Sequence, residues 1–266
     1  SELQARLEWL WATWQQVIAI DDPTIASAWL GGVIDGELGD LAADAHRADA
    51  SYRSQLQQAA QRCLALADDA AWRQVRVDRK LRLWLVANQR WTDLEQLIHQ
   101  VLLYGAIPPT VIQHGRVYAV AAHSSGAADA PVRYLELAES QTALSGCIEH
   151  VTWRDQQLEA HGWAFIRGLD LGSETPELTA ELVEPITGYS YPCDVTQLQR
   201  PAANEWAGFR YQDVATAGFV VGIDTQRIDR IAGRWQLRLT VRAHGLERTG
   251  PILAVAPGGA GHLMWG

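Results

Sequence analysis

Aromatic residues are the side chains of this sequence whose chemistry points most directly to a ligand. The chain has 12 tryptophans in 266 residues, against three phenylalanines. Sugar rings present apolar C–H faces that stack on indole and phenol rings, while arginines and carboxylates take their hydroxyl groups. Carbohydrate binding is therefore one chemistry that these residues could perform. The candidates are Trp153, Trp163, Tyr189, Tyr191 and Trp206, with Arg238 and Arg242 as polar partners.

Two tryptophans need a further distinction. Trp163 lies in a segment with bulky side chains on both faces, so it fits the core and the surface equally well. Trp235 continues an alternating apolar row and is predicted to be buried. Exposed tryptophans also serve subunit contacts, where this residue type is enriched.

Motifs for catalysis are absent from the sequence. It contains no GxGxxG, P-loop, HExxH or GxSxG pattern. The adjacent aspartate pairs, Asp21–Asp22 and Asp68–Asp69, belong to helix starts and turns, and the eight histidines lack paired ligand spacing. We predict no catalytic residue, no metal site and no cofactor.

Glycoside hydrolysis would need two carboxylates that face each other. Acidic residues are common on solvated strand faces, and a sequence cannot place two of them face to face. The carboxylates that could supply such a pair are Glu149, Asp155, Glu159, Glu181 and Glu184.

The charge and the apolar runs exclude two classes of partner. The formal net charge is −9, and no basic block offers the concentrated positive face that nucleic acids need. No apolar run approaches the roughly 20 residues that span a bilayer, and the first residues lack a secretion signal. The three cysteines are odd in number and show no CxxC spacing, which favours free thiols in a reducing compartment. We therefore expect a cytoplasmic protein without a transmembrane segment that does not bind nucleic acid.

The first hundred residues have the apolar spacing of amphipathic helices. Asp22 before Pro23 predicts a helix start, with a helix continuing to about residue 44. Further helices are predicted at 52–67 and 78–88, and Thr92 with Glu95 predicts a capping box that opens a helix ending near Gly105.

The hydrophobic period changes after the prolines at 108 and 109. The segment 111–120 predicts a hairpin with a His-Gly turn, and 122–131 has the small, polar composition of a linker. We therefore expect a helical domain at 1–107, a hairpin and linker at 108–130, a β domain at 131–256, and a tail or the start of another domain at 257–266.

Short apolar runs separated by turn residues dominate the second half. Their spacing, without intervening helices, favours an antiparallel β-sandwich of immunoglobulin-like or jelly-roll type. The fold class is thus α+β. Strands are predicted at 133–137, 144–153, 158–166, 178–183, 207–211, 219–223 and 235–241.

Several stretches resemble one family. Residues 77–87 (VDRKLRLWLVA) and 91–97 (WTDLEQL) look like the helical segment that follows the catalytic domain in bacterial family-two glycosyltransferases of the teichoic-acid type. Residues 158–170 and 239–252 are similar to the β domain of those proteins, some of which continue into a CDP-glycerol glycerophosphotransferase domain. The motifs are structural, and no catalytic residue of the family has a matching position here.

The resemblance implies that the chain is a non-catalytic accessory region of a cell-surface polysaccharide or teichoic-acid glycosyltransferase. The resemblance implies that a catalytic domain precedes Ser1 and is the partner of this region. It also implies a peripheral location at the inner face of the membrane. Such β modules are associated with homo-oligomerisation or with engaging the glycan polymer. The alternative is a free-standing carbohydrate-binding or carbohydrate-active β-sandwich protein.

Overall fold

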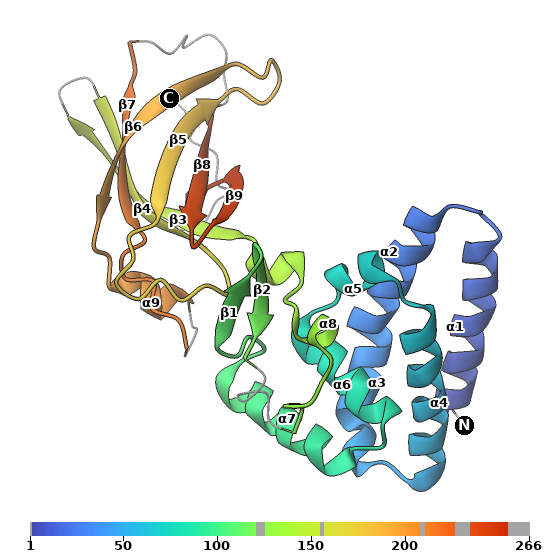
Figure 1. Ribbon diagram of the computed structural model, residues 1–266. Coiled ribbons are helices and arrows are strands. Elements are labelled where there is room, and N and C mark those ends of the chain that lie inside the picture. Colours follow the sequence, from blue (N-terminus) through green and yellow to red (C-terminus); the bar gives the residue numbers. More distant parts are fainter. Residues whose placement is uncertain (1, 121–125, 155–156, 208–210, 227–234, 255–266) are drawn as a thin grey trace. The chain divides into compact units, whose positions relative to one another are not determined.

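The computed structural model describes residues 2–120, 126–154, 157–207, 211–226 and 235–254 (Figure 1). The chain divides into two compact units, Ser1–Gln141 and Thr142–Gly266. The first is mainly helical and the second is built on a sheet, which confirms the α+β class. Residues 131–141, which the sequence analysis grouped with the β domain, belong to the helical unit.

The helical unit follows the predicted order of helices, with two short α-helices that were not predicted, α5 and α8. The helix expected from Pro23 to residue 44 is interrupted by one π-helical turn, η1. The elements are α1 (Glu2–Ile18), α2 (Pro23–Val33), η1 (Ile34–Leu38), α3 (Gly39–Asp44), η2 (Ala45–Arg47), α4 (Ala50–Leu66), α5 (Asp69–Gln74), α6 (Val77–Ala87), α7 (Trp91–Tyr104), β1 (Thr110–Gln113), β2 (Arg116–Ala119) and α8 (Val132–Leu135).

Two local predictions about helix and hairpin starts are confirmed and one is wrong. The Asp22 carboxylate accepts the amide of Thr24 at 2.8 Å, as an N-cap should. His114 and Gly115 have positive φ and form the two-residue turn between β1 and β2. The capping box fails because α7 begins earlier, at Trp91, so Thr92 lies inside its first turn.

Helix α6 forms the centre of the helical unit, where it contacts α3, α4, α7 and α8 (Figure 1). Nine of its 11 residues are buried, including Asp78, Lys80 and Arg82. Lys80 is 1% exposed, and its ammonium group donates to the Glu136 carbonyl at 2.8 Å. A helix that is covered all round must find partners inside the protein for its polar side chains.

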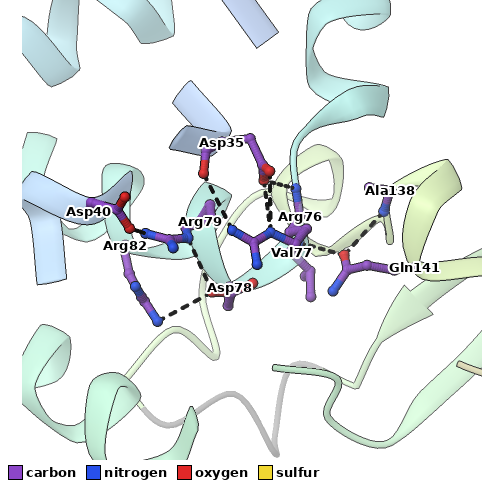
Figure 2. Close-up of polar contacts among 9 residues, drawn as sticks. All are labelled: Asp35, Asp40, Arg76, Val77, Asp78, Arg79, Arg82, Ala138 and Gln141. Atoms are coloured by element: carbon purple, nitrogen blue, oxygen red, sulfur yellow. Dashed lines mark hydrogen bonds and ion pairs between the residues drawn. The ribbon is translucent and has the colours of Figure 1, made fainter. Parts of the chain in front are cut away.

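Distant residues cap the start of α6 (Figure 2). The Asp35 carboxylate accepts the Arg76 amide at 2.8 Å, and the Gln141 side-chain oxygen accepts the Val77 amide at 2.8 Å. The first amides of a helix have no partner within the helix, so these groups replace a local cap. The sequence around residue 76 shows no capping signal because the caps lie more than 40 residues away.

The described residues of the second unit form one sheet of eight strands in the order β10-β3-β4-β7-β6-β5-β8-β9. All neighbours are antiparallel except β10 and β3. The strands are β3 (Leu144–Arg154), β4 (Gln157–Ile166), β5 (Glu177–Val183), β6 (Ser190–Leu198), β7 (Gly218–Asp224), β8 (Gln236–Ala243), β9 (Leu246–Pro251) and β10 (Leu253–Ala254), with helix α9 (Ala202–Ala207) after β6.

This sheet differs from the predicted sandwich. Its hydrogen-bonded neighbours form an unbroken series, and the sheet curls so that β4 contacts β8 across its inner face. The bend lies in β6, whose residues 190–193 pair with β5 and whose residues 194–198 pair with β7. Strand β6 is thus shared by both halves of the sheet, whereas the two sheets of an aligned sandwich pack face to face as separate sheets.

Further segments differ from their predictions. Residues 132–135 form helix α8, where a strand was expected at 133–137. Of the strand expected at 207–211, Ala207 ends helix α9, and residues 208–210 lie outside the described residues. Strands β6, β9 and β10 were not predicted, and β6 carries a proline, Pro192, which is uncommon within a sheet. Within the described residues, no helix combines the length and apolar character that a membrane span requires.

Candidate functional site

A pocket of about 300 Å³ opens where β6 separates from β7. The pairing of these strands begins at Asp194 and Gly222, so the preceding residues of β6 and the following residues of β7 diverge. Pro192, which pairs with Glu181 of β5, has no N–H to donate across this gap. The lining consists of Gln157, Leu182, Tyr191, Pro192, Cys193, Asp194, Ile223 and Asp224.

The pocket combines an apolar floor with oxygen and nitrogen groups. Leu182 and Ile223 are buried, and the polar residues of the lining are Asp194, Asp224 and Gln157. The Asp224 carboxylate also accepts the Gln226 amide at 3.0 Å. Such a lining can pack against the C–H groups of a sugar and hydrogen-bond its hydroxyls. Burial raises the pKa of the Cys193 thiol to about 11, so this side chain is a neutral thiol at pH 7.

Tyr191 connects the pocket to a buried tryptophan. Its ring centroid lies 5.5 Å from that of Trp235, at an interplanar angle of 59°. Trp235 is 3% exposed, as predicted from its apolar row, and its indole N–H has no hydrogen-bond partner among the described residues. The Tyr191 ring is thus held against a rigid aromatic side chain.

A tight turn between β5 and β6 carries a second aromatic residue to this end of the sheet. The Glu184 carboxylate accepts the amides of Ile186 and Thr187 and the Thr187 hydroxyl. The hydrogen bonds from Thr187 lower the pKa of Glu184, so the carboxylate stays charged and continues to accept the hydrogen bonds of the turn. Tyr189 follows with 70% of its surface exposed.

Trp153 lies at the same end, on the other side of the pocket. It is the penultimate residue of β3 and pairs with Leu158 of β4, next to the pocket residue Gln157. Its side chain is 61% exposed. The register also places the end of β7 and the start of β6 at this end, so three predicted candidates, Trp153, Tyr189 and Tyr191, gather there.

The other two aromatic candidates lie elsewhere. Trp163 is 6% exposed and stacks on Phe165 with a centroid distance of 5.4 Å, so it belongs to the core. Trp206 is exposed on α9, which follows the opposite end of β6. Neither lines the pocket.

Arg238 and Arg242 project from the face of β8 opposite its buried Leu237, Leu239 and Val241. Arg242 bridges Glu177 at 3.1 Å and Glu247 at 2.5 Å. Arg238 lies 3.4 Å from Glu181. These guanidinium groups belong to cross-strand ion pairs, and they do not line the pocket.

Four of the five carboxylates that could have formed a hydrolytic pair take part in separate interactions. Glu149 binds Arg200 at 2.7 Å, Glu159 lies 3.9 Å from Arg154, Glu181 binds Arg238, and Glu184 binds its own turn. Asp155 lies outside the described residues. Among the residues that the structure describes, no three His, Cys, Asp or Glu side chains gather as metal ligands would.

Sequence reasoning missed the pocket itself together with Asp194, Asp224 and Gln157. These residues come from three strands, and only the divergence of β6 from β7 brings them together. The one available signal was Pro192, which marks a place where a strand cannot pair on both sides.

Comparisons with known proteins place the chain in no family. No family model matches it, and no curated protein matches it. Among solved structures, a crystal structure of S. aureus TarS residues 217–571 aligns with a TM-score of 0.40 and 7% identity, over 80% of this chain and 52% of that one. Another, of S. aureus TarS, aligns with a TM-score of 0.33 and 10% identity, over 87% of this chain and 36% of that one.

The chain therefore spans about half or less of the length of these structures. At such TM-scores and identities, the likeness assigns neither a family nor an activity to this chain.

Proposed function

We propose that this chain is a glycan-engaging accessory region of a bacterial cell-surface polysaccharide or teichoic-acid glycosyltransferase. The observation that carries glycan engagement is the pocket between β6 and β7, which is lined by Tyr191 and flanked by exposed Trp153 and Tyr189. The link to a glycosyltransferase rests on the sequence resemblance at 77–97, 158–170 and 239–252. A location at the inner face of the membrane belongs to the same proposal.

The described lining favours an uncharged glycan over an anionic one. It carries two carboxylates and no cationic side chain among the described residues. The arginines that could attract a phosphate polymer, Arg238 and Arg242, are occupied by glutamates. Phosphate groups would therefore be repelled at the pocket by like charge.

Calorimetric titration of the chain tests this function. We expect binding to a member of a panel of neutral oligosaccharides, and weaker binding to poly-ribitol and poly-glycerol phosphate. Tyr191→Ala should lower the affinity about tenfold, as removal of a stacking side chain does. Trp206→Ala, the matched control away from the pocket, should leave it unchanged. Absence of binding to every glycan in the panel would contradict the proposal.

Subunit contact is a second candidate function, and it has its own supporting observation. Leu102 and Leu103 are both exposed at the end of α7. Adjacent exposed leucines favour a protein contact. Light scattering on the native chain and on Leu102→Gln/Leu103→Gln tests this, since a homo-oligomer held there should dissociate in the variant.

Catalysis by the chain itself is the competing outcome. Incubation with UDP-sugars and with glycosides should release no product. Turnover by the purified chain would instead support a free-standing carbohydrate-active protein.

A further inference from the structure

Aromatic residues at this end of the sheet extend beyond the pocket. Trp153 lies on β3 and Tyr191 lies on β6. Strands β4 and β7 lie between these two strands in the sheet. Three strand steps of about 4.8 Å each make about 14 Å along a paired sheet, and Tyr191 lies where β6 has already separated from β7. Tyr189 directly precedes β6, and its carbonyl oxygen accepts the amide of Glu184, the residue after β5, at 2.8 Å. It therefore lies at the same end of the sheet as Tyr191.

This spacing exceeds the reach of one sugar ring. The pocket, at about 300 Å³, lies at the lower end of the range for small-molecule sites and suits a single sugar unit. The exposed rings of Trp153 and Tyr189 lie outside its lining, so they can contact only units that extend beyond the pocket.

We infer that the site binds an uncharged oligosaccharide that runs across the strands, with one unit in the pocket and its neighbours stacked on Trp153 and Tyr189. This inference rests on the proposed glycan engagement and defines the ligand further. Tyr191 serves the central subsite, and the two exposed rings serve outer subsites.

The three subsites make different predictions for short and long ligands. Tyr191 touches the unit in the pocket, so its loss weakens a monosaccharide and an oligosaccharide alike. Trp153 and Tyr189 touch only the outer units, so their loss weakens the oligosaccharide alone. Because both side chains are exposed, their replacement leaves the core intact.

The experiment compares glucose with cellotetraose and N-acetylglucosamine with chitotetraose, by calorimetric titration of the chain and of Trp153→Ala, Tyr189→Ala, Tyr191→Ala and Trp206→Ala. We expect the preferred tetramer to bind at least about tenfold more tightly than its monomer. Trp153→Ala and Tyr189→Ala should each remove most of that difference without changing monomer binding. Thermal unfolding should confirm that each variant is folded.

Other results would contradict either the proposed function or the inference about the oligosaccharide. Failure of all four sugars to bind contradicts the proposed function itself, together with the inference. Equal affinities for monomer and tetramer, or unchanged tetramer binding in Trp153→Ala and Tyr189→Ala, overturn the inference alone. If Trp153→Ala and Tyr189→Ala change the molar mass measured by light scattering but keep the affinity for the tetramer, Trp153 and Tyr189 form a subunit contact. The inference is then also overturned.

Discussion

In the helical unit Asp78, Lys80 and Arg82 lie inside the core, whereas in the sheet Arg238 and Arg242 lie on an exposed face. The buried groups depend on one another because water cannot replace a lost partner. The exposed ion pairs can exchange their partners for water at little cost. The charges of the helical core therefore cannot lose a partner without a large cost, whereas the ion pairs on the surface of the sheet can be replaced by water.

Loss of the Asp78 carboxylate should give the largest effect. Its Oδ2 lies 3.2 Å from the Arg82 guanidinium, and both side chains are less than 10% exposed. Burial raises the pKa of Asp78, and burial also lowers the pKa of Arg82. Asp78→Ala leaves a buried cation without its anion and should lower the free energy of unfolding by about 3–5 kcal/mol in urea titrations.

Asp40→Ala is the matched control for this change. Asp40 binds the neighbouring Arg79 at 2.6 Å but is 67% exposed. Its removal should cost at most about 1 kcal/mol. Equal losses for the two variants would show that burial does not set the difference.

Lys80 should make stability depend on pH. Burial lowers its pKa from 10.5 to about 8. Between these values the unfolded chain holds a proton that the folded chain has released, so Lys80 should contribute a rise of about 3 kcal/mol to the free energy of unfolding. The three cysteines, whose pKa values burial raises, contribute a fall above about pH 9. Below pH 8 the side chain is charged in both states, and the folded state carries the full cost of its burial.

Urea titrations of the native chain and of Lys80→Met from pH 7.5 to 10.5 measure this contribution as the difference between the two profiles, because the cysteines titrate alike in both. The native free energy of unfolding should gain on that of Lys80→Met as pH rises, whereas Arg73→Met, an exposed change on the neighbouring helix, should follow the native profile. A difference that stays constant with pH would assign the effect to other groups.

The sheet should respond to added volume more than to lost charge. A Cβ at Gly162 would collide with the Cys147 carbonyl oxygen and lie 2.9 Å from Phe219. Gly162→Ala should therefore destabilise the chain by about 1–3 kcal/mol. At Gly222 the nearest atom would be the Asp194 oxygen at 4.0 Å, so Gly222→Ala should be tolerated. Thermal unfolding of both variants checks the contrast.

Arg242→Ala should have the smallest effect. It removes two exposed ion pairs, with Glu177 and Glu247, and should change the free energy of unfolding by less than about 1 kcal/mol. Neutral-glycan affinity should not change, because the side chain lies on the face opposite the buried row of β8. A clear loss of binding would place the ligand on that outer face.

Local chemistry explains which parts of the fold the sequence could predict. The cap at Asp22 and the turn at His114 and Gly115 are determined by neighbouring residues, and both were found. The start of α6 depends on Asp35 and Gln141, which are distant in sequence, so no local pattern announces it. Strand β6 was missed because its proline serves a bend that only the assembled sheet requires.

The candidate site shows the same division. Residue type alone singled out Trp153, Tyr189 and Tyr191, since sugar stacking needs aromatic rings. It also singled out Trp163 and Trp206, which the structure places in the core and on α9. Separating these groups requires strand register and burial, which come from long-range pairing.

The bend of β6 also affects how its backbone exchanges hydrogen with water. Residues 190–193 pair with β5 but have left the ladder to β7, so one edge of this segment faces the pocket. Amides of a segment that is paired with only one neighbouring strand should exchange faster than those of β4, which is paired on both sides. A glycan bound between β6 and β7 would slow this exchange. Amide exchange in β6 would therefore detect binding of a sugar that absorbs no visible or near-ultraviolet light.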